Sequence, residues 1–199
     1  MFVKICGINT RDALAAAVES GADALGFVFA ESPRFISPQK AALLCRDLPQ
    51  EVRRIAVMRH PTAEQVKVVM QEFWPDWLQT DVADFDTLQV PPDCTPLPVF
   101  RDTLVREAAP KRWPRRLVFE AAQSGQGKTA DWELARSIAT ETDLVLAGGL
   151  NTDNLAEAIR QVRPWGVDVS SGVEKVPGIK CPHKIRQFVA LARGTEVHG

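Results

Sequence analysis

The sequence predicts a compact single-domain (βα)8 barrel, also called a TIM barrel, and three observations support this fold class. Short apolar runs alternate with amphipathic stretches along the chain, which is the pattern of strands followed by helices. Eight such pairs occur at about 25 residues each, and eight is the number of βα units that closes a barrel. No linker-like stretch divides residues 1–199, which are therefore expected to form one domain. An open doubly wound sheet is the alternative, because two middle strands are weakly signalled.

The first three βα units have the clearest boundaries. Thr10 is a suitable N-cap for a first helix, and Gly21 is placed to end it. Ser37 followed by Pro38 opens a second helix, because Pro suits the first helical position. The expected strands are Phe2 to Cys6, Ala24 to Phe29 and Arg54 to Met58, and the expected helices run from Thr10 to Glu19, from Ser37 onward and from Thr62 to about Phe73.

The next two units are the least regular part of the pattern. Four prolines between residues 91 and 98 interrupt it, and proline cannot donate a hydrogen bond within a sheet. A fourth strand is expected from Trp77 to Thr80, with only a short helical or loop segment behind it at about 84–88. A fifth is expected from Leu97 to Phe100, followed by a helix broken by proline at about 103–109.

The last three units are regular again. The expected strands are Leu117 to Glu120, Leu144 to Ala147 and Val167 to Ser170. Their helices are expected at 130–139, from an N-cap at Asn151 or Thr152 to Val162, and at 182–193.

Composition excludes several function classes. A net charge of −1 gives no electrostatic reason to expect nucleic acid or an anionic membrane as a partner. No apolar run approaches the roughly 20 residues that span a bilayer, and the N-terminus lacks the features of a secretory signal. The four cysteines lie far apart and there are only three histidines, so neither a metal cluster nor a disulfide framework is expected. A cytoplasmic protein is the expectation.

The strongest chemical signal lies in the loops after the seventh and eighth strands. Gly148 and Gly149 stand before a helix start, and Ser170, Ser171 and Gly172 offer hydroxyl and backbone N–H donors beside them. These two loops are the usual phosphate site of such barrels, because helix N-termini favour anions. The alternative is that the glycines only turn the chain.

The segment AQSGQGKT at 122–129 fits a loose nucleotide-binding loop pattern. Such a site needs Lys128 on the phosphates, Thr129 on Mg²⁺ and an acidic residue at another strand end. The next strand, DLVLAGG, ends in glycines without an acid. Nucleotide hydrolysis is therefore the less favoured interpretation.

Cys6 and Glu120 are the candidate proton-transfer groups. Cys6 ends the first strand, and Lys4 shares its strand face and is expected to lower the thiol pKa if it lies close. Glu120 ends the sixth strand, so the two groups are expected to face each other across the barrel mouth. The pair suits a general base and a general acid in an isomerisation that needs no metal or redox cofactor. An inert buried cysteine is the alternative for Cys6.

Arg34 follows a Ser-Pro pair in the loop after the second strand. Its guanidinium can clamp a carboxylate in bidentate fashion. On spacing alone, a solvated loop arginine is an equally good interpretation.

Several motifs together resemble the phosphoribosylanthranilate isomerase family of tryptophan biosynthesis. The matching pieces are VKICGINTRDA at 3–13, GADALGFVFAESPRFISP at 21–38, GQGKTADW at 125–132, LAGGLNTDNLAEAI at 146–159 and GVDVSSGVE at 166–174. The resemblance implies a compact (βα)8 barrel without a cofactor. It also implies an Amadori rearrangement, in which the ribose of N-(5′-phosphoribosyl)anthranilate opens and the carbonyl moves along the sugar.

The same resemblance implies roles for individual residues. Cys6 resembles the base that removes the proton from the second sugar carbon, and Arg34 the partner of the anthranilate carboxylate. The implied partner is a small phosphosugar, and a monomer or a homodimer fits a barrel of this size. The implied substrate contacts further include a loop with Gly125 and Gly127, a phosphate cradle of Gly148, Gly149, Ser170, Ser171 and Gly172, and Asp168 nearby.

Two positions depart from the family pattern. The family has an aspartate as general acid at the end of strand six, where this chain has Glu120. After strand four the family reads Gln-Leu-His-Gly, and Asp81 stands here in place of the histidine. Arg59, where the family commonly has asparagine, is a hypothetical compensating charge for Asp81. These departures leave two alternatives to the isomerase function, which are a paralogue acting on another aminoaldose phosphate and a catalytically silent phosphosugar-binding protein.

Overall fold

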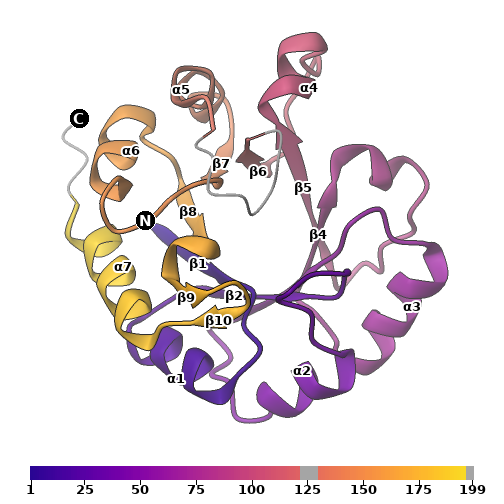
Figure 1. The fold of residues 1–199 in the computed structure, drawn as a ribbon. Helices are drawn as coiled ribbons and strands as arrows, with labels where there is room; N and C mark the ends of the chain where they lie inside the picture. Colours follow the sequence, from indigo (N-terminus) through magenta and orange to yellow (C-terminus); the bar gives the residue numbers. More distant parts are fainter. Residues whose placement is uncertain (122–129, 196–199) are drawn as a thin grey trace.

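The computed structural model describes residues 1–121 and 130–195, and its centre is a closed barrel of eight parallel strands (Figure 1). Each strand pairs with the next along the chain, and the last pairs with the first. Closure confirms the predicted barrel over the open doubly wound sheet. The strands are β1 (Phe2–Cys6), β2 (Ala24–Val28), β3 (Arg53–Val57), β4 (Trp77–Asp81), β5 (Thr95–Arg101), β6 (Arg116–Glu120), β7 (Asp143–Leu146) and β8 (Gly166–Val169).

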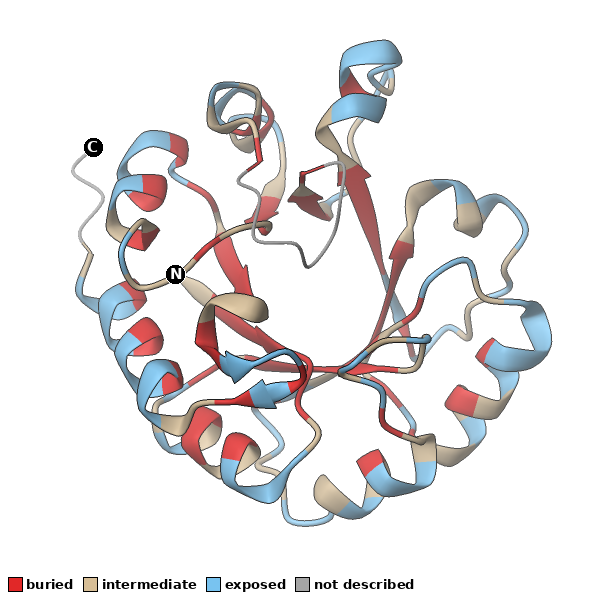
Figure 2. Ribbon diagram, in the orientation of Figure 1, coloured by how far each residue is buried: buried red, intermediate tan, exposed pale blue. Residues whose placement is uncertain are grey.

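Helices surround the strand ring, as Figure 1 shows. Their buried residues face the strands, whereas their outer faces are exposed (Figure 2). The connection after β4 is only a 3-10 turn, η1, as the weak pattern there predicted. The helical segments are α1 (Arg11–Glu19), α2 (Pro38–Leu44), α3 (Ala63–Glu72), η1 (Val82–Asp86), α4 (Asp102–Glu107), α5 (Trp132–Ala139), α6 (Leu155–Val162) and α7 (Pro182–Gly194).

Side-chain caps explain where several helices begin. The hydroxyls of Thr10 and Ser37 accept hydrogen bonds from backbone N–H groups of the first turns of α1 and α2, as predicted. The predicted cap of α6 is wrong. The side chain of Asn151 accepts from the backbone N–H of Asp153 and Asn154 and so closes a turn, and the helix begins only after Asn154. Asparagine favours such local turns, which delays the helix.

A small hairpin after β8 has no counterpart in the predicted element pattern. A 3-10 turn, η2 (Ser171–Val173), leads into two short antiparallel strands, β9 (Glu174–Val176) and β10 (Ile179–Lys180). Asn9 donates a hydrogen bond from its side chain to the carbonyl of Gly178, at the tip of this hairpin. The hairpin is thus tied to the loop after β1, and it places Glu174 and Lys180 beside the barrel mouth.

Apolar side chains form two layers of core. The larger lies between the strands and the helices, and a smaller cluster with Ile55, Trp77 and Val118 fills the barrel interior. The interior is therefore packed rather than open. Among the described helices, none is long and apolar enough to cross a membrane.

Candidate active site

A pocket of about 310 Å³ opens at the carboxyl ends of the strands. Besides Arg59, six of the residues singled out from the sequence lie in its wall, which confirms that the barrel brings them together. They are Cys6, Arg34, Asp81, Glu120, Asp168 and Ser170. The same wall includes Gln79 and Arg101.

Cys6 lies beside a buried ion pair at the junction of β1 and β8. Lys4 is fully buried, and its Nζ lies 2.7 Å from Oδ2 of Asp168. Burial raises the pKa of the Cys6 thiol and outweighs the lowering effect of Lys4 and Lys180. Lys4 thus acts on the thiol in the predicted direction, but it does not bring the pKa below the usual value. The thiol is the dominant form of Cys6 in the free protein at neutral pH.

Glycine at position 26 makes room for this arrangement. A Cβ added to Gly26 would lie 3.0 Å from Cys6 Sγ and 3.2 Å from Lys4 Cε. A larger residue on β2 would therefore press on both functional side chains.

Arg34 is held by the hairpin that follows β8. Its Nε and Nη2 donate to the two carboxylate oxygens of Glu174, at 2.8 and 3.0 Å, in a bidentate pair. Lys180 donates to the same carboxylate at 2.8 Å. Burial favours the neutral form of Glu174, but hydrogen bonds from Arg34 and Lys180 outweigh it and lower its pKa. Arg34 is thus a fixed cation in the pocket wall, not a solvated loop arginine.

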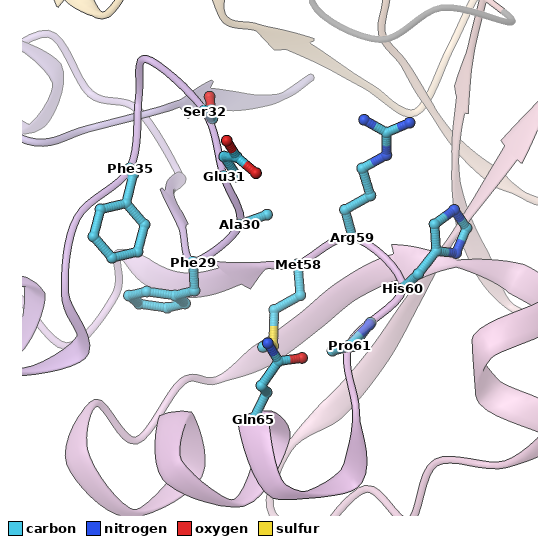
Figure 3. Close-up of a pocket in the computed structure, with 10 residues that line it drawn as sticks. All are labelled: Phe29, Ala30, Glu31, Ser32, Phe35, Met58, Arg59, His60, Pro61 and Gln65. Atoms are coloured by element: carbon cyan, nitrogen blue, oxygen red, sulfur yellow. The ribbon is translucent and has the colours of Figure 1, made fainter.

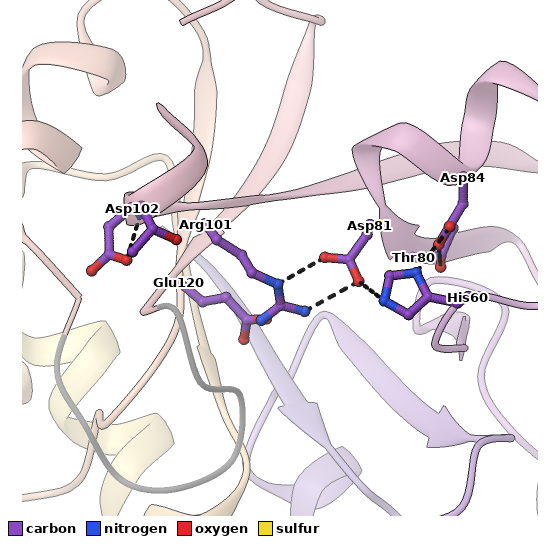
Figure 4. Close-up of polar contacts among 8 residues, drawn as sticks. His60, Thr80, Asp81, Asp84, Arg101, Asp102 and Glu120 are labelled. Atoms are coloured by element: carbon purple, nitrogen blue, oxygen red, sulfur yellow. Dashed lines mark hydrogen bonds and ion pairs between the residues drawn. The ribbon is translucent and has the colours of Figure 1, made fainter. Parts of the chain in front are cut away.

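Glu120 and Asp81 are joined through Arg101, the last residue of β5. Arg101 donates from Nε to Asp81 and from Nη1 to Glu120, each at 2.9 Å. The other side of Asp81 faces His60 (Figure 4). The hypothesis that Arg59 compensates Asp81 is therefore wrong. Because β5 lies between β4 and β6, a side chain at its end reaches both carboxylates.

The loops after β7 and β8 pack closely against each other. Gly148 and Gly149 have positive φ angles of 83° and 67°, which glycine adopts without strain. A Cβ on Gly172 would lie 2.0 Å from the carbonyl oxygen of Leu150, so only glycine permits this contact. Lys180 adds a cation, since its Nζ donates to the backbone oxygen of Ser170 at 2.9 Å. Ser171 begins η2 in the same loop.

Gly125 and Gly127, predicted to contact the substrate, lie outside the described residues.

Two buried acceptors in the pocket wall have no hydrogen-bond donor among the described residues. They are Oε1 of Gln79 and Oδ1 of Asp168. Buried acceptors are normally satisfied, so these two atoms suit a ligand that brings hydroxyl or N–H donors.

A wider hollow of about 590 Å³ adjoins the pocket at the loops after β2 and β3. Figure 3 shows Phe29 and Phe35 on one side of it and Arg59 and His60 on the other. Glu31, Ser32 and Arg59 line both spaces. The pocket therefore opens on this side toward a hollow lined by both apolar and charged residues.

Three functional candidates were missed by the sequence reasoning: Arg101, Glu174 and Lys180. Arg101 directly follows the predicted fifth strand, so reading each strand end would have found it. Glu174 and Lys180 lie on the short hairpin, whose strands of three and two residues give no periodic signal.

The comparisons with known proteins agree with this geometry. Residues 3–191 match the family model described as N-(5'phosphoribosyl)anthranilate (PRA) isomerase. The chain belongs to this family. An N-(5'-phosphoribosyl)anthranilate isomerase of Pelobacter propionicus is 41% identical over 206 residues, which cover 97% of this chain and 96% of that protein.

Solved structures of the isomerase family superpose over nearly the whole chain. A phosphoribosylanthranilate isomerase of Thermotoga maritima, described as monomers generated from a dimeric enzyme, has a TM-score of 0.80 and 32% identity, covering 98% of this chain and 99% of that one. Another isomerase, in complex with reduced 1-(o-carboxyphenylamino)-1-deoxyribulose 5-phosphate, has a TM-score of 0.76 and 30% identity, with the same coverage.

Proposed function

We propose that this chain catalyses the Amadori rearrangement of N-(5'-phosphoribosyl)anthranilate with Cys6 as general base and Glu120 as general acid. The isomerase activity, a step of tryptophan biosynthesis, follows from family membership along almost the full length. The observation that supports the roles is the shared pocket, in which a thiol at the end of β1 and a carboxylate at the end of β6 line one space.

The proposed substrate contacts divide the pocket by chemistry. The phosphate binds the N–H groups and hydroxyls of Gly148, Gly149, Ser170, Ser171 and Gly172, where the two loops meet. Arg34 receives the anthranilate carboxylate, with its orientation fixed by Glu174. Asp168 accepts from the sugar hydroxyls. Asp81 lies at the edge of the substrate space, and Gly125 and Gly127 are included on sequence alone.

The proposed reaction needs one group that donates a proton and one that removes a proton. Glu120 donates a proton to the ring oxygen of the ribose, the bond between that oxygen and the first carbon breaks, and the first carbon becomes a protonated imine. The thiolate form of Cys6 then takes the proton from the second carbon, and the electron pair moves to give an enamine with an enol. The enol becomes the ketone of the product as its hydroxyl loses a proton and the first carbon gains one. Proton exchange with solvent then returns Cys6 to the thiolate and Glu120 to the acid. Such positioned acids and bases each contribute about 10²–10⁴-fold.

The decisive experiment follows the loss of substrate fluorescence. The substrate is formed in place from anthranilate, phosphoribosyl pyrophosphate and the transferase that joins them. We expect turnover by the purified chain, and loss of most of it in Cys6→Ala and Glu120→Ala. Cys45→Ala, which changes a cysteine outside the pocket wall, is the matched control and should remain active.

Absence of turnover above background would refute the proposed function. A mild effect of Glu120→Ala alongside a large effect of Cys6→Ala would instead transfer the acid role to Asp81. We further propose that the enzyme is cytoplasmic, because its composition fits that compartment. We also propose that it is a monomer or a homodimer, because one relative is described as dimeric.

A further inference from the structure

Arg101 occupies a central place between the two positions at which this chain departs from the family pattern. It ends β5, Asp81 ends β4 and Glu120 ends β6, so the three side chains come from consecutive strands (Figure 4). The strand register places Arg101 directly opposite Glu120. One guanidinium therefore joins the two carboxylates.

The bonds of Arg101 differ on its two sides. Toward Asp81 it donates two hydrogen bonds, from Nε to Oδ1 at 2.9 Å and from Nη2 to Oδ2 at 3.2 Å. Toward Glu120 the Nη1 group donates at 2.9 Å. A bidentate pair fixes the plane of a guanidinium, so the contact with Asp81 determines where Nη1 points.

The surroundings make these contacts stronger than surface ion pairs. The side chains are 23% exposed for Arg101, 15% for Asp81 and 13% for Glu120. Burial alone would lower the pKa of Arg101, but its contacts with Asp81 and Glu120 outweigh burial and raise it. Arg101 thus stays charged and holds its two partners in a partly desolvated setting.

We propose that Arg101 is a positioning residue for the general acid Glu120, and that Asp81 acts through Arg101 to hold it in place; this inference rests on the proposed function. Glutamate has one more rotatable bond than aspartate, so its carboxyl group needs a partner to stay in one place. The hydrogen bond from Nη1 supplies that partner. A misplacement of about 1 Å at a reacting group costs on the order of a hundredfold in rate.

Asp81 also offsets the charge of Arg101. A bare guanidinium beside Glu120 would favour the ionised carboxylate, which cannot donate a proton. Paired with Asp81, Arg101 presents a fixed donor to Glu120 with much of its charge neutralised. The aspartate at the end of β4 thereby helps the glutamate at the end of β6 to act as the general acid.

His60, Asp81 and Asp84 also bring ligand atoms within 4.8 Å of one another. Arg101 already donates to both oxygens of Asp81, which favours an ion-pair network over a cation site.

The test is a double-mutant cycle of steady-state kinetics with Arg101→Met, Glu120→Gln and the double variant. We expect Arg101→Met to lower kcat by about 10–100-fold with little change in KM. Glu120→Gln should lower kcat by about 10²-fold or more. In the Glu120→Gln background, Arg101→Met should add less than about a twofold loss, because its effect passes through the missing carboxyl group.

Two further variants complete the design. Arg53→Met, at an exposed residue at the start of β3, is the matched control and should not change kcat. Arg101→Lys keeps a cation without the bidentate geometry. Its kcat should lie between those of the parent and Arg101→Met, and this loss should appear only when Glu120 is present. It serves as the test if Arg101→Met fails to fold, as judged by circular dichroism.

Three results would overturn the proposal: an unchanged kcat in Arg101→Met, a loss only in KM, or an equal loss of kcat in the Glu120→Gln background. The last would reveal a merely structural role. Turnover by the unsubstituted chain separates these results from failure of the proposed function, which would abolish activity in every variant and in the parent.

Discussion

The two sides of the pocket hold their charges in different ways. At the junction of β8 and β1, Lys4 and Asp168 form a pair whose side chains are 0% and 8% exposed. Across the mouth, the network of His60, Asp81 and Arg101 begins at a histidine whose side chain is 64% exposed. Charge is therefore buried on one side and reaches solvent on the other.

This difference predicts separate roles for the two sides. A buried ion that loses its partner cannot recover water, so the β8–β1 side has to stay intact for the barrel to fold. The contacts of the exposed His60 on the other side contribute little stability, because water replaces them when they are lost. Substitution is therefore expected to be tolerated at His60 better than at Lys4.

Lys4→Met should have the largest effect on stability. It leaves the carboxylate of Asp168 buried and unpaired, and we expect a loss of about 3–5 kcal/mol in the free energy of unfolding by urea. Lys67→Met, at an exposed lysine 3.9 Å from Glu64, is the matched control and should cost less than about 1 kcal/mol. Equal effects of the two substitutions would show that the buried pair of Lys4 and Asp168 contributes no more stability than an exposed pair.

Glu174→Gln should have the next largest effect, with a defined pH dependence. The pKa of Glu174 lies below its ordinary value of 4.5 in the folded chain, so its ionised form stabilises the fold. We expect a loss of about 3 kcal/mol at neutral pH, because Arg34 and Lys180 would face each other without their anion. The stability difference between Glu174→Gln and the parent should be largest above the pKa that Glu174 has in the unfolded chain. It should shrink as pH falls through the lower pKa that Glu174 has in the folded chain. Urea unfolding between pH 3 and 7, spanning the ordinary carboxyl range, measures it.

Glu141→Gln, at an exposed carboxylate, controls for the loss of one charge and should change the free energy of unfolding by less than about 1 kcal/mol at neutral pH. A stability difference for Glu174→Gln that grows toward low pH would contradict the stabilising role of the ionised carboxylate.

Gly172→Ala should have an intermediate effect and act on both stability and binding. The added methyl group meets the backbone oxygen of Leu150, so the phosphate loops have to separate. We expect a loss of about 1–3 kcal/mol in unfolding free energy and a raised KM. Gly194→Ala, where a Cβ meets nothing within 4 Å, should change stability by less than about 1 kcal/mol. An unchanged KM in Gly172→Ala would argue against a phosphate site between these loops.

His60→Ala should have the smallest effect. The histidine faces Asp81 and Asp84, but both contacts are made at the surface. We expect a change of less than about 1 kcal/mol in unfolding free energy. A larger loss would show that the exposed side of the pocket is as important for folding as the buried one.

Periodicity and turn chemistry predicted the barrel and most element boundaries, because each βα unit repeats the same local rules. They also predicted which strand ends meet at the mouth, and so brought Cys6, Arg34 and Glu120 into one pocket. Local rules did not show which charges pair. Strand order cannot tell whether Arg59 or Arg101 reaches Asp81, because β3 and β5 both pair with β4, and the direction that each side chain takes decides it.

The pair of Lys4 and Asp168 also has a consequence for the order of folding. Its two members are 164 residues apart in the chain, and they meet only when β8 closes the ring against β1. Contacts of such long sequence separation form slowly, because a large loop has to close first. During synthesis, Lys4 and Cys6 emerge almost at once, whereas Asp168 and Lys180 arrive much later. The thiol thus acquires its full set of charged neighbours only after most of the polypeptide has been made.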